Sequence, residues 1–547
     1  MTPTAGRRAG ISRRRCLLTA AALAVPVRQA HAAGTAPILT GTSLALEVGP
    51  VPIPGSRQMA IGVNGTVPAP ILHWREGDTV TVAVTNRLTE PTSIHWHGLR
   101  VPAAMDGVPG FSFPGIPPGG TFVYRLPLLQ AGTYWYHGHS GGQEQRGLYG
   151  AIVIDPRQGY PQPFDRDYVV LLSDRSEEMP EEIVSNLKVQ SDYYNRGGRT
   201  MATFFTDIRR QGLSATISNR LEWGKMRMSP TDILDVSGAT YTYLINGQPP
   251  GANWTALFRP GERVRLRFIN GSAMTLFDVR IPGLAMTVVQ ADGNDIAPVT
   301  IDEFRFAPGE TYDVIVQPDT DAAFGLFAQA MDRSGHAFGT LAPRAGMIAP
   351  TPPMDPRPLR TMADMGMAGM EHGEMPDMRI DPARLGVTVD NVAMMPANRL
   401  NEPGTGLEDN GRRVLTYGQL QPLRPTPAAR PTRVVALRLT GNMARYIWGF
   451  DGVGYADAAP IAVGLGERVR FAITNDTMME HPIHLHGFWS ELETTPAGPP
   501  LLKHTIIVKP GEMLRFLVTF DVPGRWAFHC HMLYHMDTGM FREVRVA

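Results

Sequence analysis

The sequence predicts an all-β protein of three Greek-key β-sandwich domains, with a Met-rich linker before the third. Gly (57) and Pro (48) are spread along the 547 residues, and Pro disfavours long helices while suiting turns and edge strands. A Gly turn followed by alternating apolar and polar residues also recurs three times, at 76–98, 260–283 and 465–487. Strands of period two between Gly and Pro turns are typical of such sandwiches, whose chemistry lies in loops at strand ends.

A second module recurs at 117–139, 307–318 and 509–531. Together the modules predict domain 1 at 38–160, domain 2 at 161–348, the linker at 349–385 and domain 3 at 386–547. Domain 2 has Phe277 and Val279 near the place where the other copies carry His, so we expect it to hold no metal and to act as a spacer. A short helical insert is expected to begin at Pro180, with Ile183 and Leu187 on one face.

Residues 1–33 are interpreted as an export signal. Arg13, Arg14 and Arg15 precede an apolar run and the small-x-small ending 30–32. The run is shorter than the roughly 20 residues that span a bilayer. The Ser-Arg-Arg opening resembles the twin-arginine type, and an ordinary secretory signal with extra arginines is the alternative. We therefore expect an exported chain without membrane insertion, in which Cys530 is the single remaining cysteine.

The charge balance excludes some classes of partner. The chain has 51 basic and 51 acidic residues, so its formal net charge is zero. A balanced surface gives no argument for nucleic acid or an anionic membrane. We expect no nucleic-acid partner.

Ten of the fifteen His fall into four short clusters within the repeated modules of domains 1 and 3. On a strand, an H-x-H pair projects both imidazoles to one face, so two nitrogens can reach one metal ion or two adjacent ones. One such pair is weak evidence, but four pairs in matching positions of two repeats favour a metal site. The ten are His95, His97, His137, His139, His481, His484, His486, His529, His531 and His535.

The C-terminal stretch 527–541 adds soft ligands to this set. Cys530, His481 and His535, with Met540 as a weak axial ligand, make up the His₂Cys plus Met set of a blue copper centre. The other eight His have no carboxylate or thiol among them. All-imidazole ligation suits copper clusters that bind and reduce dioxygen.

With these motifs the chain resembles the three-domain multicopper oxidases, the family that includes laccases, over essentially its whole mature length. The resemblance implies cupredoxin-like domains, dioxygen as acceptor and four copper ions, one of type 1, one of type 2 and two of type 3. It assigns the type 1 copper to the blue set above. It places the type 2 copper on His95 and His484, and the type 3 pair on His97, His137, His139, His486, His529 and His531.

The implied electron path and proton path each involve few residues. His529 and His531 flank Cys530, so an electron taken at the blue site crosses covalent bonds and one imidazole to reach the cluster. Asp106 matches an acid that lies beside the cluster in relatives, and we expect it to assist proton delivery. A turn-forming Asp before Gly107 is an equally good account.

The linker holds six Met in the seventeen residues 362–378, together with His372, Asp364, Glu371 and Glu374. Thioethers are soft ligands that select Cu(I) over harder cations. We predict additional copper sites here, and the alternative is a flexible linker in which Met is incidental. The six are Met362, Met365, Met367, Met370, Met375 and Met378.

Two further Met pairs lie near predicted loops. They are Met226 with Met228 and Met478 with Met479. Core packing by adaptable Met is as good an account of them as function.

These stretches, with 132–150 and 243–250, resemble the exported copper-resistance branch of the family. That resemblance implies a periplasmic protein of a Gram-negative bacterium that oxidises Cu(I), binds surplus copper, or both. We predict an oxidase that couples one-electron oxidation of Cu(I) to four-electron reduction of dioxygen to water. The alternatives are a laccase-like oxidase of small phenols and mainly a copper sink. Other copper-resistance proteins are candidate partners.

Overall fold

The structure, a computed structural model, describes residues 36–226, 228–362, 364, 366, 384–425, 430–495 and 498–547. The predicted export signal, with Cys16, lies outside these residues. So does most of the Met-rich tract. The predicted site residues concerned are Met365, Met367, Met370, Met375 and Met378, along with Glu371, His372, Glu374 and the side chain of Met226.

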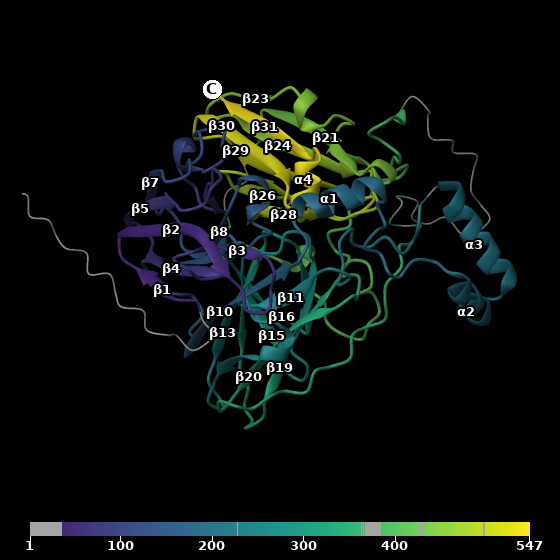
Figure 1. The fold of residues 1–547 in the computed structure, drawn as a ribbon, viewed down its shortest axis with the longest axis horizontal. Coiled ribbons are helices and arrows are strands. Elements are labelled where there is room, and N and C mark those ends of the chain that lie inside the picture. Colours follow the sequence, from purple (N-terminus) through teal and green to yellow (C-terminus); the bar gives the residue numbers. More distant parts are fainter. Residues whose placement is uncertain are drawn as a thin grey trace, which may run out of the picture. The chain divides into compact units, whose positions relative to one another are not determined.

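Six sheets form three successive pairs, each built from one segment of the chain (Figure 1). Residues 38–155 form sheets of order β1-β4-β9-β8-β6 and β3-β2-β5-β7. Residues 166–342 form β11-β10-β13-β18-β15-β16 and β12-β20-β19-β14-β17. Residues 433–546 form β22-β21-β24-β29-β26-β27 and β23-β31-β30-β25-β28. The predicted all-β class of three sandwiches is confirmed, and the domain limits at 160, 348 and 385 stay predictions.

The strands of the first segment are β1 (Ile38–Thr40), β2 (Ser43–Pro52), β3 (Met59–Val63), β4 (Ala69–Arg75), β5 (Thr79–Asn86), β6 (His95–His97), β7 (Thr121–Pro127), β8 (Gly132–His137) and β9 (Tyr149–Asp155). Those of the second are β10 (Arg166–Arg175), β11 (Thr242–Ile245), β12 (Trp254–Leu257), β13 (Val264–Asn270), β14 (Phe277–Arg280), β15 (Met286–Ala291), β16 (Asn294–Ile301), β17 (Glu303–Phe306), β18 (Thr311–Val316), β19 (Phe324–Ala330) and β20 (His336–Ala342). Those of the third are β21 (Arg433–Asn442), β22 (Ile447–Phe450), β23 (Ile461–Val463), β24 (Arg468–Asn475), β25 (His481–Leu485), β26 (Ser490–Leu492), β27 (Leu501–Lys503), β28 (Thr505–Val508), β29 (Met513–Thr519), β30 (Gly524–Cys530) and β31 (Phe541–Val546).

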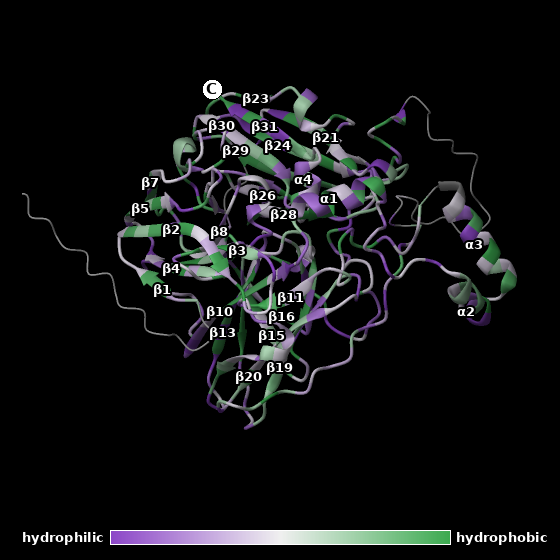
Figure 2. Cartoon of the chain, in the orientation of Figure 1, coloured by the Kyte–Doolittle hydropathy of each residue, from purple (hydrophilic) through white to green (hydrophobic). Residues whose placement is uncertain are grey.

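The alternating pattern in the sequence places one strand face in each core. In β5, Val80, Val82 and Val84 are fully buried, and the residues between them are less so. They pack with Leu46 of β2 and Tyr124 of β7, among others, in one apolar cluster. Figure 2 shows the same alternation of hydrophobic and hydrophilic residues along β24 and β31. This is the period-two pattern from which the sandwiches were predicted.

The first repeated module corresponds to two consecutive strands, one in each sheet of a pair, so the chain crosses between the sheets after the first strand. The crossing joins β5 to β6, β13 to β14 and β24 to β25. His95 and His97 lie in β6, and His481 and His484 lie in β25. The corresponding strand of the middle segment, β14, begins at Phe277. The repeat therefore delivers imidazoles from the two end segments and apolar side chains from the middle one.

Four α-helices lie between the strands of the described residues. They are α1 (Pro180–Val189), α2 (Met201–Gln211), α3 (Leu213–Met226) and α4 (Leu533–Asp537). The helix predicted to start at Pro180 is α1, and its Ile183 and Leu187 are buried as expected. Within the described residues, no helix has the length and apolar character needed to cross a bilayer.

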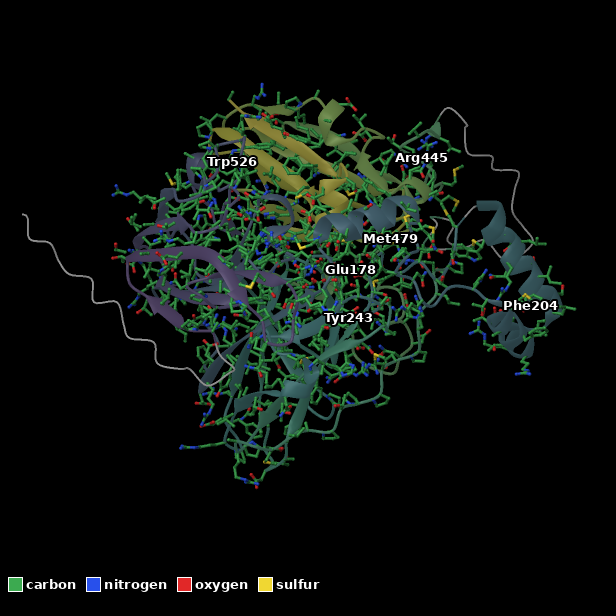
Figure 3. The ribbon with its side chains drawn as sticks, viewed as in Figure 1. Glu178, Phe204, Tyr243, Arg445, Met479 and Trp526 are labelled. Atoms are coloured by element: carbon green, nitrogen blue, oxygen red, sulfur yellow. The ribbon has the colours of Figure 1, made fainter. Side chains whose placement is uncertain are left out.

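The hairpin of α2 and α3 was not predicted. Gly212 joins the two helices with a φ of +87°, which favours glycine. Phe204, labelled in Figure 3, lies under the guanidinium of Arg220 at 5.1 Å from the ring centre. The hairpin lies in the segment expected to be a simple middle sandwich.

Part of the predicted linker is firmly packed. Arg360 is fully buried and makes two hydrogen bonds to Glu480, at 2.9 and 2.5 Å. Asp364, expected to help collect copper, instead pairs with Arg399 at 2.9 Å and accepts the backbone N–H of Thr361. A buried Arg–carboxylate pair is stable only when both partners stay in place, so this part of the linker is anchored beside His481.

Replacing Asp390 by Asn should stabilise the protein at pH 7.5 but not at pH 4.5. Burial raises the pKa of Asp390 to about 6, above the unfolded value of about 3.9. Between these values the folded state keeps a proton that the unfolded state has lost, so the free energy of unfolding falls as the pH rises, by at most about 3 kcal/mol. Asn keeps an acceptor for the backbone N–H of Met443, which now donates to Asp390 at 2.6 Å.

The measurement is the melting temperature of the copper-loaded protein at both pH values. Asp319→Asn, at an exposed position, is the control. A difference between Asp390→Asn and the parent that is the same at both pH values would contradict the prediction.

Candidate metal centres

Cys530 lies with two imidazoles in a compact soft-ligand site. Its Sγ is 3.6 Å from His481 Nδ1 and 3.8 Å from His535 Nδ1, and the two Nδ1 atoms are 3.1 Å apart. His481 begins β25, Cys530 ends β30 and His535 lies in α4. Met540 is buried in the same core, and its carbonyl accepts the backbone N–H of Cys530 at 3.1 Å. The structure thus brings together the predicted His₂Cys set.

The chemistry of this thiol fits a bound soft cation. Burial raises the pKa of Cys530 well above its usual value, so without a cation the group stays a thiol. A soft metal ion binds the thiolate and displaces its proton. The two facing Nδ1 atoms complete a ligand set of the blue copper type.

The outer nitrogens of both imidazoles have partners that orient the rings. His535 Nε2 lies 2.5 Å from Asp235 Oδ2, and the hydroxyl of Tyr446 donates to the same oxygen at 3.1 Å. His481 Nε2 lies 2.7 Å from Thr477 Oγ1. A carboxylate can only accept here, so His535 carries its proton on Nε2 and turns the lone pair of Nδ1 toward Cys530.

Asp235 changes the expected role of the middle segment. It belongs to residues 161–348, which were predicted to act as a spacer. The segment supplies no imidazole to the described metal sites, but through Asp235 it orients a ligand of domain 3. The spacer interpretation is therefore too simple.

The other eight predicted imidazoles meet where residues 95–139 contact residues 484–531. Strand pairing explains the meeting. His95 lies opposite His137 in the β6–β8 ladder, and His484 lies opposite His529 in the β25–β30 ladder. The two ladders face each other, with 3.5 Å between Nε2 of His95 and Nε2 of His484.

The remaining six imidazoles divide into two groups of three. His486 Nε2 lies 2.9 Å from His529 Nε2, and His139 completes that group. In the other group, His531 Nε2 lies 3.2 Å from His97 Nδ1. The ring of His137 is 5.1 Å from that of His531. One pair and six further imidazoles match the two ligands that the resemblance assigns to the type 2 ion and the six that it assigns to the type 3 pair.

Four cluster imidazoles have a tautomer that the geometry determines. The outer Nδ1 of each lies near a backbone oxygen, which can only accept, so Nδ1 carries the proton and Nε2 keeps its lone pair. The pairs are His95 with Asp106 O at 2.8 Å, His137 with Gly138 O at 3.0 Å, His484 with His504 O at 2.6 Å and His529 with Cys530 O at 2.8 Å.

The imidazoles of His137 and His139 are neutral and have unused acceptors. Burial, aided by neighbouring imidazoles, lowers the pKa of His137 well below its usual value and that of His139 to about 3. The Nε2 atoms of both are buried without a hydrogen-bond partner among the described residues. Buried lone pairs of neutral imidazoles are what copper ions require of their ligands, so these residues fit the implied copper ions.

Asp106 bonds to the cluster from both sides. Its Oδ2 lies 2.9 Å from His486 Nδ1, and its backbone oxygen holds His95. It also caps a 3-10 turn, Ala103–Met105, before Gly107, whose φ is +85°. Asp106 therefore has the expected place in a turn, and its role in proton delivery stays a prediction.

Sequence reasoning missed several residues that contact the predicted ligands. Glu144 lies 2.7 Å from His137 Nδ1. Because Glu144 lies only five residues after His139, the sequence could have suggested it as a partner of these imidazoles. Asp235 and Thr477 gave no recognisable pattern. His504 stands alone in the sequence, outside every H-x-H pair, yet its Nδ1 lies 3.1 Å from His97 Nε2.

Three of the predicted methionines meet around one Trp. Trp223 of α3 and Met478 are buried, and Met228 and Met362 pack against them. Met478 directly follows Thr477, whose hydroxyl contacts His481. Met479, labelled in Figure 3, belongs instead to the large apolar core, where packing explains it.

The chain is similar to proteins that handle copper. Family models described as multicopper oxidase match residues 46–159, 219–345 and 428–547. The chain is 52% identical to "Copper resistance protein A homolog" of Pseudomonas syringae pv. tomato and 52% identical to "Copper resistance protein A" of Escherichia coli. Each alignment covers 93% of this chain and 93% of the relative.

Solved structures share the fold at low sequence identity. A multi-copper oxidase from Pseudomonas thermotolerans matches with a TM-score of 0.60 at 23% identity, over 93% of this chain and 100% of that one. A multicopper oxidase from Campylobacter jejuni, described as a metallo-oxidase, matches with a TM-score of 0.60 at 20% identity, over 94% of both chains.

Proposed function

This chain belongs to the multicopper oxidase family, and we propose that it oxidises Cu(I) with dioxygen as acceptor, as part of copper tolerance. The names of the two relatives that are 52% identical support the tolerance role. The balanced reaction consumes four Cu(I), one dioxygen and four protons, and yields four Cu(II) and two waters. The expected site for it is the periplasm, reached through the twin-arginine signal predicted at 1–33.

Within this proposal each copper has its own residues. His481, Cys530, His535 and Met540 would hold the type 1 ion. The type 2 ion is assigned to His95 and His484, whose Nε2 atoms face each other. The type 3 pair is assigned to the two groups of three, which are His139, His486 and His529, and His97, His137 and His531.

When bound, these ions supply one-electron transfer and the reduction of dioxygen to water. The chain supplies the rest. Cys530 connects the two donor sets covalently, because His529 and His531 are its neighbours in the chain. Backbone oxygens hold four of the imidazoles with their lone pairs inward, those of His95, His137, His484 and His529. Burial of the cluster, in which His97 and His486 are 0% exposed and His139 is partly exposed, limits the access of bulk water to it.

The observation that favours Cu(I) as the electron donor is the packing of three methionines around Trp223. They are Met228, Met362 and Met478. Thioethers select Cu(I), and an aromatic face favours a nearby cation. The peptide from Met478 to Thr477, followed by the contact of Thr477 with His481, is a short route from this methionine cluster to the type 1 ligands. Three separated segments of the chain contribute to it, which incidental Met in a flexible linker does not explain.

The residues that bury His535 favour a small electron donor over a bulky one. His535 is 0% exposed, and the Asp235 side chain that contacts its Nε2 is 1% exposed. Trp448 also packs on the His535 ring, with 4.0 Å between centroids. A phenol has no exposed edge of a proposed type 1 imidazole to touch, since both His481 and His535 are 0% exposed. Electrons from a phenol must travel farther.

We expect the triple variant Met228→Leu, Met362→Leu, Met478→Leu to lose Cu(I) oxidation selectively. Leu keeps the volume and removes the three sulfurs. The expected kcat/KM for Cu(I) falls about tenfold or more, equivalent to about 1.4 kcal/mol of transition-state free energy, while that for an organic dye changes less than twofold. The measurement is oxygen uptake with each donor, and Met395→Leu, at an exposed position, is the matched control.

Two outcomes would contradict the proposal. Equal losses for Cu(I) and the dye would show that the methionines support the fold or the type 1 site in general. Copper binding by the parent without oxygen uptake during Cu(I) addition would identify a copper sink and not an oxidase.

A further inference from the structure

His504 is a ninth buried imidazole at the cluster, outside the ligand set assigned above. It is 1% exposed, and its ring lies 4.7 Å from that of His97 in an edge-to-face arrangement. Its Nδ1 is 3.1 Å from His97 Nε2. It therefore contacts a proposed ligand from outside the cluster.

His97 is the exception among the cluster imidazoles. His95, His137, His484 and His529 donate Nδ1–H to backbone oxygens and turn Nε2 inward. His97 is reversed. Its Nδ1 faces His531 Nε2 at 3.2 Å, and its Nε2 points outward. No backbone oxygen meets that outer nitrogen among the described residues, so its tautomer must be set in another way.

Two side chains lie within reach of the outer nitrogen. These are His504 Nδ1 and Thr505 Oγ1, each 3.1 Å from His97 Nε2. The threonine hydroxyl can donate as well as accept, so it permits either tautomer of His97. Only one proton can lie between the two facing histidine nitrogens, so if His97 uses Nδ1 as a ligand, the proton lies on His97 Nε2 and His504 Nδ1 accepts it. His504 then carries its own proton on Nε2, which is buried without a hydrogen-bond partner among the described residues, while Asp292 Oδ2 lies 3.6 Å from His504 Nδ1.

We propose that His504 is a positioning residue of the imidazole cluster, whose Nδ1 accepts the Nε2–H of His97 and so makes His97 present Nδ1 to the copper site. The inference rests on the cluster assignment made under the proposed function. His97 with the opposite tautomer would direct an N–H at the position of the metal ion, and its lone pair would be lost as a ligand.

The fold holds His504 in the required orientation from two sides. Asp292, from the middle segment, accepts the backbone N–H groups of His504 and Thr505, each at 3.1 Å. On the other side lies Gly98, with a φ of +82°, where an added Cβ would come within 2.5 Å of His504 Cδ2. Trp489 stacks on the same ring, with 6.0 Å between centroids. Asp292 is a second link, after Asp235, from the middle segment to a metal site.

Two substitutions separate hydrogen bonding from packing. His504→Asn places an amide oxygen near the former Nδ1 and keeps an acceptor, while His504→Leu has similar bulk and no acceptor. Thr505→Val is the matched control, because it removes the alternative partner. Each copper-loaded variant is compared with the parent for copper per chain, type 2 electron paramagnetic resonance, blue absorbance, and kcat and KM for Cu(I).

We expect His504→Leu to lower copper affinity at the cluster or kcat about 10- to 100-fold, the usual effect of losing an outer partner of a metal ligand. Because His97 is assigned to the type 3 pair, His504→Leu binds fewer copper ions at the cluster, while blue absorbance and KM stay within twofold of the parent because the type 1 site is separate. His504→Asn recovers most of the loss, and Thr505→Val stays close to the parent.

Three results would overturn the inference. They are a His504→Leu protein with parental copper content, spectrum and kcat, a His504→Asn protein as impaired as His504→Leu, and a loss confined to Thr505→Val. A parent that fails to bind four copper ions would instead refute the cluster assignment, so the two failures can be told apart.

Discussion

Replacing Cys530 by Ser abolishes the blue absorbance and lowers oxygen uptake with Cu(I) by more than about 10³-fold, or about 4 kcal/mol of activation free energy. The sulfur lies between His481 and His535 and is the only thiol among the described residues. A serine hydroxyl is a hard ligand and stays protonated in this buried site, so it cannot replace the thiolate. The measurement combines visible absorbance, copper content and oxygen uptake.

The control for this variant is Met540→Leu, which removes only the sulfur proposed as a weak ligand of the type 1 ion. We expect it to keep the blue absorbance and to change the potential of the type 1 site. Cys530→Ser should still bind the cluster copper ions, because the backbone oxygen of residue 530, which the substitution keeps, holds the neighbouring imidazole of His529. Cu(I) oxidation at the parental rate without the sulfur would refute the whole assignment of the site.

Chelating all copper from the protein lowers its melting temperature by about 10 °C. When the concentration of free copper is 100 times the Kd of a site, the ion bound there stabilises the folded state by about 2.7 kcal/mol, so four ions contribute about 11 kcal/mol. For a chain of this length that corresponds to about 1 °C per kcal/mol. The imidazoles come from both end segments, as the pairs His95–His484 and His97–His531 show. Copper therefore ties the two segments together.

Calorimetry of the copper-loaded, copper-free and reloaded protein checks this. Cys530→Ser serves as the internal comparison, since it lacks only the type 1 ion and should retain about three quarters of the stabilisation. Identical melting temperatures with and without copper would show that the ions do not link the two segments.

The sequence allowed the fold and the ligand candidates to be predicted because both depend on short-range patterns. Period-two alternation after a Gly turn is local, and its threefold repetition identified β5, β13 and β24. The H-x-H spacing is local as well, and it placed His95 and His97 on one strand. Matching pairs in two repeats then implied a shared site without knowledge of the contacts.

The residues around the ligands could not be predicted in this way. Asp235 and His535 are 300 positions apart, and His97 and His504 are 407 apart. Such contacts depend on how the domains dock, which no short pattern records. Tautomers depend on the outer partners in the same way.

The α2–α3 hairpin escaped prediction for a different reason. Its helices have no repeat counterpart, and much of their apolar surface is exposed, including Phe205 and Leu221. Periodicity in a helix is clear when one face packs on a core, and this hairpin packs chiefly on itself.

The pleat of β30 separates two chemical environments across a single strand. His529 lies opposite His484 and faces the imidazoles, while Cys530 lies opposite Ile483 on the reverse side. Because neighbouring residues of a strand point to opposite faces, inserting or deleting one residue before this pair would exchange the two sides. The thiol would then enter the dioxygen-reducing compartment and an imidazole would take its place in the domain core. A change in the length of the loops on either side of β30 leaves this arrangement intact, but a one-residue shift in the register of the strand does not.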